Sequence, residues 1–404
     1  MDSPISHEIP TEISGIGIGA LNAGIKQSVR PDLCLIEMTE GTSCAALFTQ
    51  NRFAAAPVIV AKRHLLENPN TRFLLINSGN ANCGTGEPGI EDALQLCNDV
   101  AKIAGCDASA VLPFSTGVIG QRLPMDIISK QLSGLIENLR DDGWHAGAEA
   151  IMTTDTRPKI AGSHFVIGDK NFSVTGIAKG AGMIRPNMAT MLSFIATDAT
   201  VSPTDLNKVL LEAARKTFNR ISIDGDTSTN DAVVLMATGK SHQEQLSPAH
   251  AQWATFCSAI TEVCEALAKE IVADGEGASK FVEIEVRSGD EKTSEAVAFT
   301  VAESPLVKTA LFASDPNWGR ILAAVGRAPV PEFEIDQVAI YLGDYQIVRN
   351  GSVVLDYDEA VAAEIMAKQE IRISIEIGEA TVPATVWTCD LSYDYVKINA
   401  EYRT

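Results

Sequence analysis

Apolar runs of strand length recur along the chain and alternate with amphipathic stretches of helical length. The strand-like runs cover residues 32–38, 71–77, 191–197 and 281–286, with a hairpin over 164–175 and a further alternating strand over 296–301. Helical spacing covers about 89–104, 124–135, 203–213, 249–272, a segment after Ser304-Pro305, and 358–368. Ser-Pro pairs before several of these helices are typical helix starts. This alternation predicts an α/β or α+β protein.

Length and charge narrow the class of protein. At 404 residues the chain exceeds the size at which one core stops growing, so two or three core regions are expected. The 52 acidic and 32 basic residues give a formal net charge of −20, which disfavours nucleic acid and anionic membranes as partners. No apolar run is long enough to span a bilayer, and the N-terminus shows no secretory signal. A cytoplasmic protein is expected.

The cysteines and histidines give no sign of a metal site. None of the eight cysteines forms a CxxC pair, and the six histidines are scattered without a zinc-binding spacing. Reduced, buried thiols are therefore expected.

The stretch with the most unusual chemistry is residues 179–197. Gly180, Gly182 and Pro186 predict an irregular loop, which runs directly into the apolar strand 191–197. Thr190 stands at the mouth of that strand. If the bond between Ala189 and Thr190 were cut, Thr190 would carry a free α-amine beside its hydroxyl, a nucleophile with its own general base. The alternative reading is a threonine that simply starts a strand.

Four other loops carry polar groups next to apolar segments. Residues 77–86 are polar and glycine-rich, and residues 219–231 form a polar loop that lacks the oxygen spacing of an EF-hand. The segment 111–120 ends in Ser-Thr-Gly, which offers a hydroxyl and an unshielded N–H, the parts of an oxyanion hole, although a tight turn explains it equally well. Glu276 lies between two glycines and reads as a carboxylate with room around it.

Four separated motifs resemble those of the ornithine acetyltransferase family, also called glutamate N-acetyltransferases. They are STGVIG from residue 115, KGAGMIRPNMATML from 179, DGEGA from 274 and NAEYRT from 399, and the likeness extends over nearly the whole chain. The resemblance implies an α/β fold with two structural regions and autocatalytic cleavage between Ala189 and Thr190. It further implies that the halves 1–189 and 190–404 stay associated, as a heterotetramer with two copies of each half.

The resemblance also implies the reaction. An acetyl group passes from N-acetylornithine to glutamate through an acetyl-threonine on Thr190, in the cyclic pathway of arginine biosynthesis. No cofactor or metal is implied, and acetyl-CoA is left open as an additional donor. Carried over onto this sequence, the catalytic residues are Thr190, Thr116 and Gly117, and the substrate-binding residues are Thr153, Lys179, Thr190, Glu276, Asn399 and Thr404. The ammonium of Lys179 is suited to the substrate's α-carboxylate.

Other functions share some of these features. A self-processing threonine amidase or aminopeptidase would pass the acyl group to water, and a related acetyltransferase of secondary metabolism would carry the same motifs. A binding protein with an uncut loop would remain one chain of 43.0 kDa.

Overall fold

The computed structural model describes residues 12–167, 170–185, 191–241 and 244–401. Within these ranges the chain divides into two compact units, one built from residues 12–219 and 226–271 and the other from 220–225 and 272–401. The buried apolar side chains of the described residues include two large clusters in the first unit and one in the second, which confirms that the chain has more than one core region. Both units combine sheets with helices, which confirms the predicted α/β class. In the part of the chain that the structure describes, no helix is long and apolar enough to cross a membrane.

The first unit is organised around two sheets that share a core. The first sheet has the order β1 (Ile16–Leu21), β2 (Leu33–Met38), β4 (Phe73–Asn80) and β5 (Val111–Val118), and the second has the order β3 (Ser43–Phe48), β11 (Ala232–Ala237), β8 (Leu192–Thr197), β7 (Lys170–Lys179) and β6 (Lys159–Ile167). Apolar side chains of both sheets form one cluster. Within it, the rings of Phe114 and Phe194 meet edge to face with centroids 5.1 Å apart. A two-stranded sheet pairs β9 (Thr200–Val201) with β12 (Gln245–Leu246).

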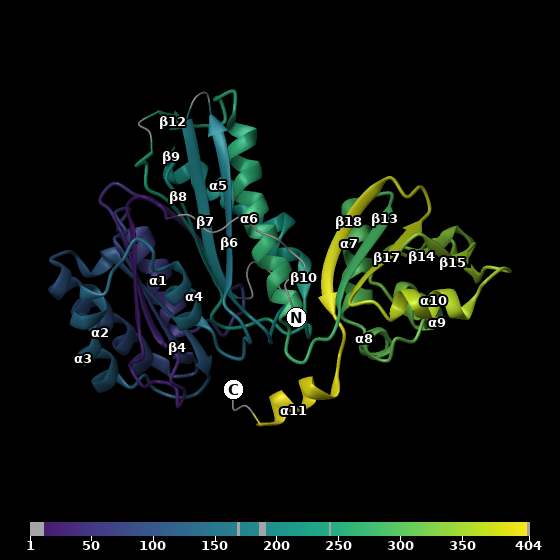
Figure 1. Cartoon of the computed structure of the whole chain (residues 1–404), viewed down its shortest axis with the longest axis horizontal. Helices are drawn as coiled ribbons and strands as arrows, with labels where there is room; N and C mark the ends of the chain where they lie inside the picture. The colour runs from purple at the N-terminus through teal and green to yellow at the C-terminus, as the bar shows by residue number, and fades with distance from the viewer. Residues whose placement is uncertain (1–11, 168–169, 186–190, 242–243, 402–404) are drawn as a thin grey trace. The chain divides into compact units, whose positions relative to one another are not determined.

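Helices cover the outer faces of these sheets. The four-stranded sheet carries α1 (Ala56–Glu67), α2 (Gly86–Ala104) and α3 (Met125–Glu137), whose apolar residues form the second core of this unit. On the five-stranded sheet lie α5 (Pro203–Lys216) and α6 (Trp253–Ala273), and Figure 1 shows α6 running beside β6 and β7. Helix α4 (Trp144–Ile151) adds its apolar residues to the core between the sheets. The unit is therefore a layered sandwich of helices, two sheets and helices.

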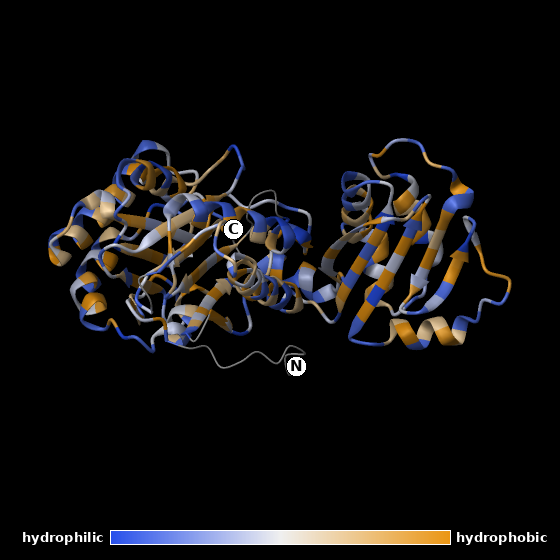
Figure 2. Ribbon diagram, turned by 90° about the horizontal axis from the view of Figure 1, so that it is seen from above, coloured by the Kyte–Doolittle hydropathy of each residue, from blue (hydrophilic) through white to orange (hydrophobic). Residues whose placement is uncertain are grey.

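The second unit contains a seven-stranded sheet with the order β10 (Ile221–Ser222), β18 (Val382–Cys389), β13 (Phe281–Ser288), β17 (Glu370–Ile377), β14 (Val338–Leu342), β15 (Tyr345–Arg349) and β16 (Ser352–Val353). Its helices are α7 (Glu291–Ala302), α8 (Pro305–Phe312), α9 (Trp318–Gly326), α10 (Glu359–Met366) and α11 (Tyr393–Glu401). Buried and less buried residues alternate along β13 and β17, and Figure 2 shows the same alternation as orange and blue bands. One face of the sheet is therefore buried against its helices.

Most of the predicted elements are present, and one is wrong. The hairpin is formed by β6 and β7, although its turn residues 168–169 lie outside the described ranges. The glycine-rich segment 13–19, whose sequence predicts a flexible strand or turn, overlaps the first four residues of the regular strand β1. Residues 296–301, predicted as a strand, belong to helix α7, which begins where Asp290 accepts a hydrogen bond from the backbone N–H of Thr293. Six residues are too few to separate strand alternation from the stripe of a helix that is buried on most sides.

Candidate active site

Thr116 and Gly117 lie near the end of β5, beside an irregularity in β4. These two strands run parallel, and their register shifts where Asn80 pairs with both Thr116 and Val118. Gly117 has φ +132°, and a Cβ added to it would lie 2.3 Å from the carbonyl carbon of Gly79. Only glycine fits this close approach of two strands. The backbone at Thr116–Gly117 is thus held rigidly and left unshielded by a side chain, which is what an oxyanion donor requires.

A buried network of amides fixes this strand end. The Ser115 hydroxyl donates to the Asn77 side chain at 2.6 Å, and the Asn77 amide donates to the backbone carbonyl of Asn80 at 2.8 Å. Asn230 reaches in from the loop before β11 and donates to the carbonyls of Ala81 at 2.6 Å and Ser115 at 2.9 Å. Because Asn230 is 5% exposed, these bonds are formed away from water and each matters for the position of the strand.

The same loop is tied to the strand that follows Thr190. The backbone N–H of Ala232 donates to the carbonyl of Met191 at 2.9 Å, and β11 then pairs in parallel with β8. Strand β8 is buried along its whole length, as the apolar run predicted. Asn230 therefore connects the Thr116–Gly117 strand end with the chain that starts one residue after Thr190. Ala189 and Thr190 themselves lie outside the described residues.

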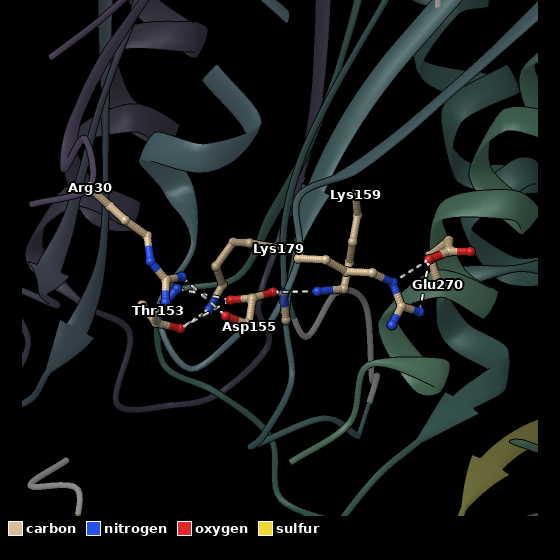
Figure 3. A network of polar contacts seen from close by, with 8 residues as sticks. Arg30, Thr153, Asp155, Lys159, Lys179 and Glu270 are labelled. Atoms are coloured by element: carbon tan, nitrogen blue, oxygen red, sulfur yellow. Dashed lines mark hydrogen bonds and ion pairs between the residues drawn. The ribbon is translucent and has the colours of Figure 1, made fainter. Parts of the chain in front are cut away.

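A second cluster surrounds the buried carboxylate of Asp155, which is drawn in Figure 3. One of its oxygens accepts from the Lys159 ammonium at 2.6 Å and from the Gly180 N–H at 2.8 Å, and the other accepts from the Thr153 N–H at 2.9 Å. Burial by itself would raise the pKa of Asp155, but the ammonium groups of Lys159 and Lys179 and these hydrogen bonds outweigh it and hold that pKa well below its usual range. Asp155 is therefore ionised and fixes the loop that carries Thr153.

Thr153 and Lys179, both predicted to contact substrate, lie next to each other. The Lys179 ammonium donates to the Thr153 hydroxyl at 3.4 Å, and Figure 3 shows the two side chains on the same side of Asp155. Lys179 ends β7 and is paired in register with Leu192, the first residue of β8. The loop that contains Thr190 therefore begins and ends beside Lys179. Lys179 is half-buried, so its ammonium is held in place and keeps some access to solvent.

A further carboxyl of this region is also buried. Asp231 is 3% exposed, and one of its oxygens has no hydrogen-bond partner among the described residues. Burial raises the pKa of Asp231 well above its usual value, against the opposing effects of the Ser228 hydroxyl and the Lys179 charge. Burial therefore disfavours a charge on Asp231.

Glu276 and Asn399 come together in the second unit. The Asn399 amide, on α11, donates to the Glu276 carboxylate at 2.7 Å. Gly277 has φ +68°, and a Cβ there would lie 2.5 Å from the backbone nitrogen of Tyr395, so the loop packs directly under the start of α11. The expectation of a carboxylate with room around it is wrong, because Glu276 is 8% exposed and hydrogen-bonded. Thr404, the remaining predicted residue, lies outside the described ranges.

The described residues offer no evident metal site. No three His, Cys, Asp or Glu side chains among them are grouped so that they could hold an ion. All eight cysteines are free thiols, and six of them are buried.

Three supporting residues were missed in the sequence, namely Asp155, Lys159 and Asn230. Asp155 and Lys159 stand four residues apart in a segment that leads into a strand, where this spacing carries no signal of a contact. Asn230 lies in the polar loop 219–231 noted in the sequence, but nothing there distinguishes it from its polar neighbours, since its two acceptors lie more than one hundred residues away in the chain.

Comparison with known proteins gives consistent results. The ArgJ family model matches residues 17–404. An arginine biosynthesis bifunctional protein ArgJ of Methylococcus capsulatus is 53% identical over 393 residues, which cover 97% of this chain and 96% of that protein. The protein of the same name from Pseudomonas fluorescens is 50% identical over 97% of both chains. A solved chain of the Bacillus halodurans protein of that name is 40% identical with a TM-score of 0.51, and the match covers 53% of this chain and all of that one.

Proposed function

This chain belongs to the ArgJ family, and we propose that it transfers the acetyl group of N-acetylornithine to glutamate with Thr190 as the nucleophile. It is an acyltransferase of arginine biosynthesis. What carries the proposed chemistry is the junction of β7 and β8, where Lys179 and Thr153 meet beside the chain that leads to Thr190.

The first step is cleavage between Ala189 and Thr190, which gives Thr190 a free α-amine. This amine takes the proton of the Thr190 hydroxyl while the oxygen attacks the acetyl carbonyl carbon of N-acetylornithine. The backbone N–H of Gly117 and the hydroxyl of Thr116 stabilise the negative oxygen that forms. The carbon–nitrogen bond then breaks, the proton goes to the departing amine of ornithine, and the acetyl group remains as an ester on Thr190.

Glutamate reverses these steps. Its neutral amine attacks the ester carbonyl, the proton returns to the Thr190 oxygen by way of the α-amine, and N-acetylglutamate leaves. Lys179 binds the α-carboxylate, which both substrates carry, through a charge-assisted hydrogen bond. Thr153 contacts the same part of the substrate, because its hydroxyl lies beside the Lys179 ammonium.

Cleavage at this place fits the length of a solved relative. The Bacillus halodurans chain is matched in full by 53% of this chain, and residues 190–404 make up that share of the sequence. Cleavage would also leave the halves joined, because β7 precedes the cut and β8 follows it, and the two strands pair along six registered positions. The division into halves thus differs from the division into compact units. We propose that two copies of each half form a heterotetramer.

Glu276 and Asn399 are proposed to bind the free ammonium of N-acetylornithine. Glutamate has no such group in that position, so Glu276→Ala is expected to slow ornithine release more than it slows acetylation of glutamate. Thr404 is included in the proposal as a substrate contact. Acetyl-CoA is proposed as a second donor, which fits the word bifunctional in the names of the relatives, and the cytoplasm is the proposed location.

Intact mass and N-terminal sequencing test the nucleophile directly. We expect the wild-type protein to give two chains, the second beginning at Thr190, and Thr190→Ala to stay at 43.0 kDa. Transfer of acetyl from N-acetylornithine to glutamate is then measured with the cleaved protein. A single uncut wild-type chain would refute the mechanism, and acetyl release to water that ignores glutamate would show an amidase instead.

A further inference from the structure

Lys26 is a lysine of the first unit that has no part in the mechanism above. It lies in the loop between β1 and β2, and this loop is firmly held. The backbone N–H groups of Ala23, Ile25 and Lys26 all donate to the buried carboxylate of Asp32, at 2.6, 2.6 and 2.9 Å. Three such bonds to one carboxylate fix the backbone from which the Lys26 side chain starts.

The side chain of Lys26 runs past both parts of the candidate active site. Its stem occupies the space in which Gly79 lacks a side chain, since a Cβ on Gly79 would lie 2.6 Å from the Lys26 Cγ. Gly79 is in register with Gly117 across β4 and β5. The Lys26 ammonium donates to the carbonyl of Met152 at 3.0 Å, one residue before Thr153. Lys26 therefore spans the distance from the proposed oxyanion strand to the proposed substrate-binding pair of Thr153 and Lys179.

Lys26 and Lys179, together called the lysine pair, are near each other. Burial lowers the pKa of Lys26, and the charges of Arg30 and Lys179 lower it further, while Asp32 and Asp155 act in the opposite direction. The two ammonium groups are held on consecutive residues, one on the Met152 carbonyl and the other on the Thr153 hydroxyl. Two ammonium groups on one short segment suit a ligand that carries two carboxylates.

The carboxylates close to the lysine pair are already engaged. Asp32 accepts three backbone N–H groups, and Asp155 accepts from Lys159 and from the backbone of Gly180 and Thr153. Asp231, a third carboxyl near Lys179, is buried, and burial raises its pKa. Lys26, Arg30, Lys159 and Lys179 thus give this region more positive than negative charge, which favours an anionic ligand.

We infer that Lys26 binds the side-chain carboxylate of glutamate and so selects the acceptor of the second half-reaction. The inference rests on the proposed function, in which Lys179 takes the α-carboxylate of either substrate. N-acetylornithine has a single carboxylate, whereas glutamate has two, so only glutamate needs both members of the lysine pair. Lys26 would then set specificity without taking part in the transfer of the acetyl group from ornithine.

The test separates the two half-reactions in Lys26→Met and Lys26→Arg. Ornithine released from N-acetylornithine in a single turnover reports the first, and decay of the acetyl-enzyme with glutamate or with its neutral analogue glutamine reports the second. In Lys26→Met we expect the rate of ornithine release to stay unchanged. The glutamate concentration needed for half-maximal decay of the acetyl-enzyme should rise roughly 10- to 100-fold, which corresponds to the loss of one charge-assisted hydrogen bond. The glutamine reaction should not change, so the preference for glutamate is lost, and Lys26→Arg should restore part of it.

Arg30→Gln is the matched control for a general loss of charge: Arg30 lies in the same loop at an exposed position, adds to the same positive charge, and donates only weakly, at 3.4 Å, to the backbone carbonyl of Asp155. It should leave the preference for glutamate over glutamine intact. The inference is overturned if Lys26→Met slows both half-reactions equally, keeps the preference for glutamate, or has no larger effect than Arg30→Gln. A wild-type enzyme that never acetylates glutamate would instead refute the proposed function and, with it, the role of Lys26; the wild-type assay alone distinguishes that case.

Discussion

Asp155 offers a sharp test of how the proposed site is held together. Asp155→Asn preserves the shape of the side chain but removes the charge that lies 2.6 Å from the Lys159 ammonium, and both side chains are fully buried. Removing one partner of a buried ion pair costs about 3–5 kcal/mol, because the other charge stays in a medium that solvates it poorly. That is a large share of the roughly 5–15 kcal/mol by which a typical protein is stable.

The loss should be measurable as a fall in the urea midpoint of unfolding. The Thr190→Ala background keeps the protein as one chain, so that dissociation of cleaved halves does not contribute. Adding Lys159→Met to Asp155→Asn removes the buried charge that was left behind, and we expect the double variant to recover part of the lost stability. In cleaved enzyme, Asp155→Asn should also raise the requirement for both substrates, because Asp155 holds the backbone of Thr153 and Gly180.

The pH dependence follows from the direction of the shift. The pKa of Asp155 is depressed in the folded protein, so its contribution to stability is complete above its unfolded pKa of about 3.9 and is lost as the pH falls through the lower folded value. The stability difference between the parent and Asp155→Asn should therefore be constant near neutral pH and shrink only in acid. A difference below about 1 kcal/mol at neutral pH, or a double variant less stable than Asp155→Asn, would contradict the argument.

Three further experiments have expected outcomes. Gly117→Ala should reduce acetyl transfer roughly 100-fold or more, because the new methyl group displaces the backbone that forms the oxyanion site, whereas Gly134→Ala, in open space on α3, should be neutral in the same assay. Asn230→Asp places a carboxylate against two carbonyl oxygens, so we expect about 1–3 kcal/mol lower stability in urea unfolding and a kcat that falls more than KM rises. Cys106 and Cys257 are the two partly exposed cysteines among the eight described, and burial raises the pKa of both thiols. A thiol reagent should therefore react slowly with no more than these two in the folded protein, and with all eight in denaturant.

Much of the secondary structure was predictable because it depends on near neighbours. Predominantly apolar runs became the buried strands β2 and β8. The Ser202 hydroxyl caps α5 by accepting from the Asp205 N–H, as the Ser-Pro start predicted. The assignment failed at 296–301, where a helix buried on most sides mimics the alternation of a strand. The sequence periodicity was misassigned, because six apolar or small residues are too few to distinguish the two-residue repeat of a strand from the 3.6-residue repeat of a helix.

Only those residues of the candidate site that belong to recognisable motifs were predictable from the sequence. Thr116, Gly117, Thr153 and Lys179 were selected from the sequence, and the structure brings Thr153 and Lys179 into contact. Their supports were not selected: the polar loop 219–231 was noted as a whole, without Asn230, and the loop that carries Lys26 was not noted. The side-chain contacts of Lys26 with Met152, and of Asn230 with Ala81 and Ser115, join residues more than one hundred positions apart.

The sequence alone determined the α/β class and most strands and capped helices, because these depend on local periodicity. It also determined the family, because the family is recognised by contiguous motifs. Tertiary structure decided the pairing of the two sheets, the ion pair of Asp155 and Lys159, and the contacts of Lys26 with Met152 and of Asn230 with Ser115. Those last contacts join residues more than one hundred positions apart. They form only when strands from distant parts of the chain come together around a shared core, and no local pattern encodes which strand ends will then meet.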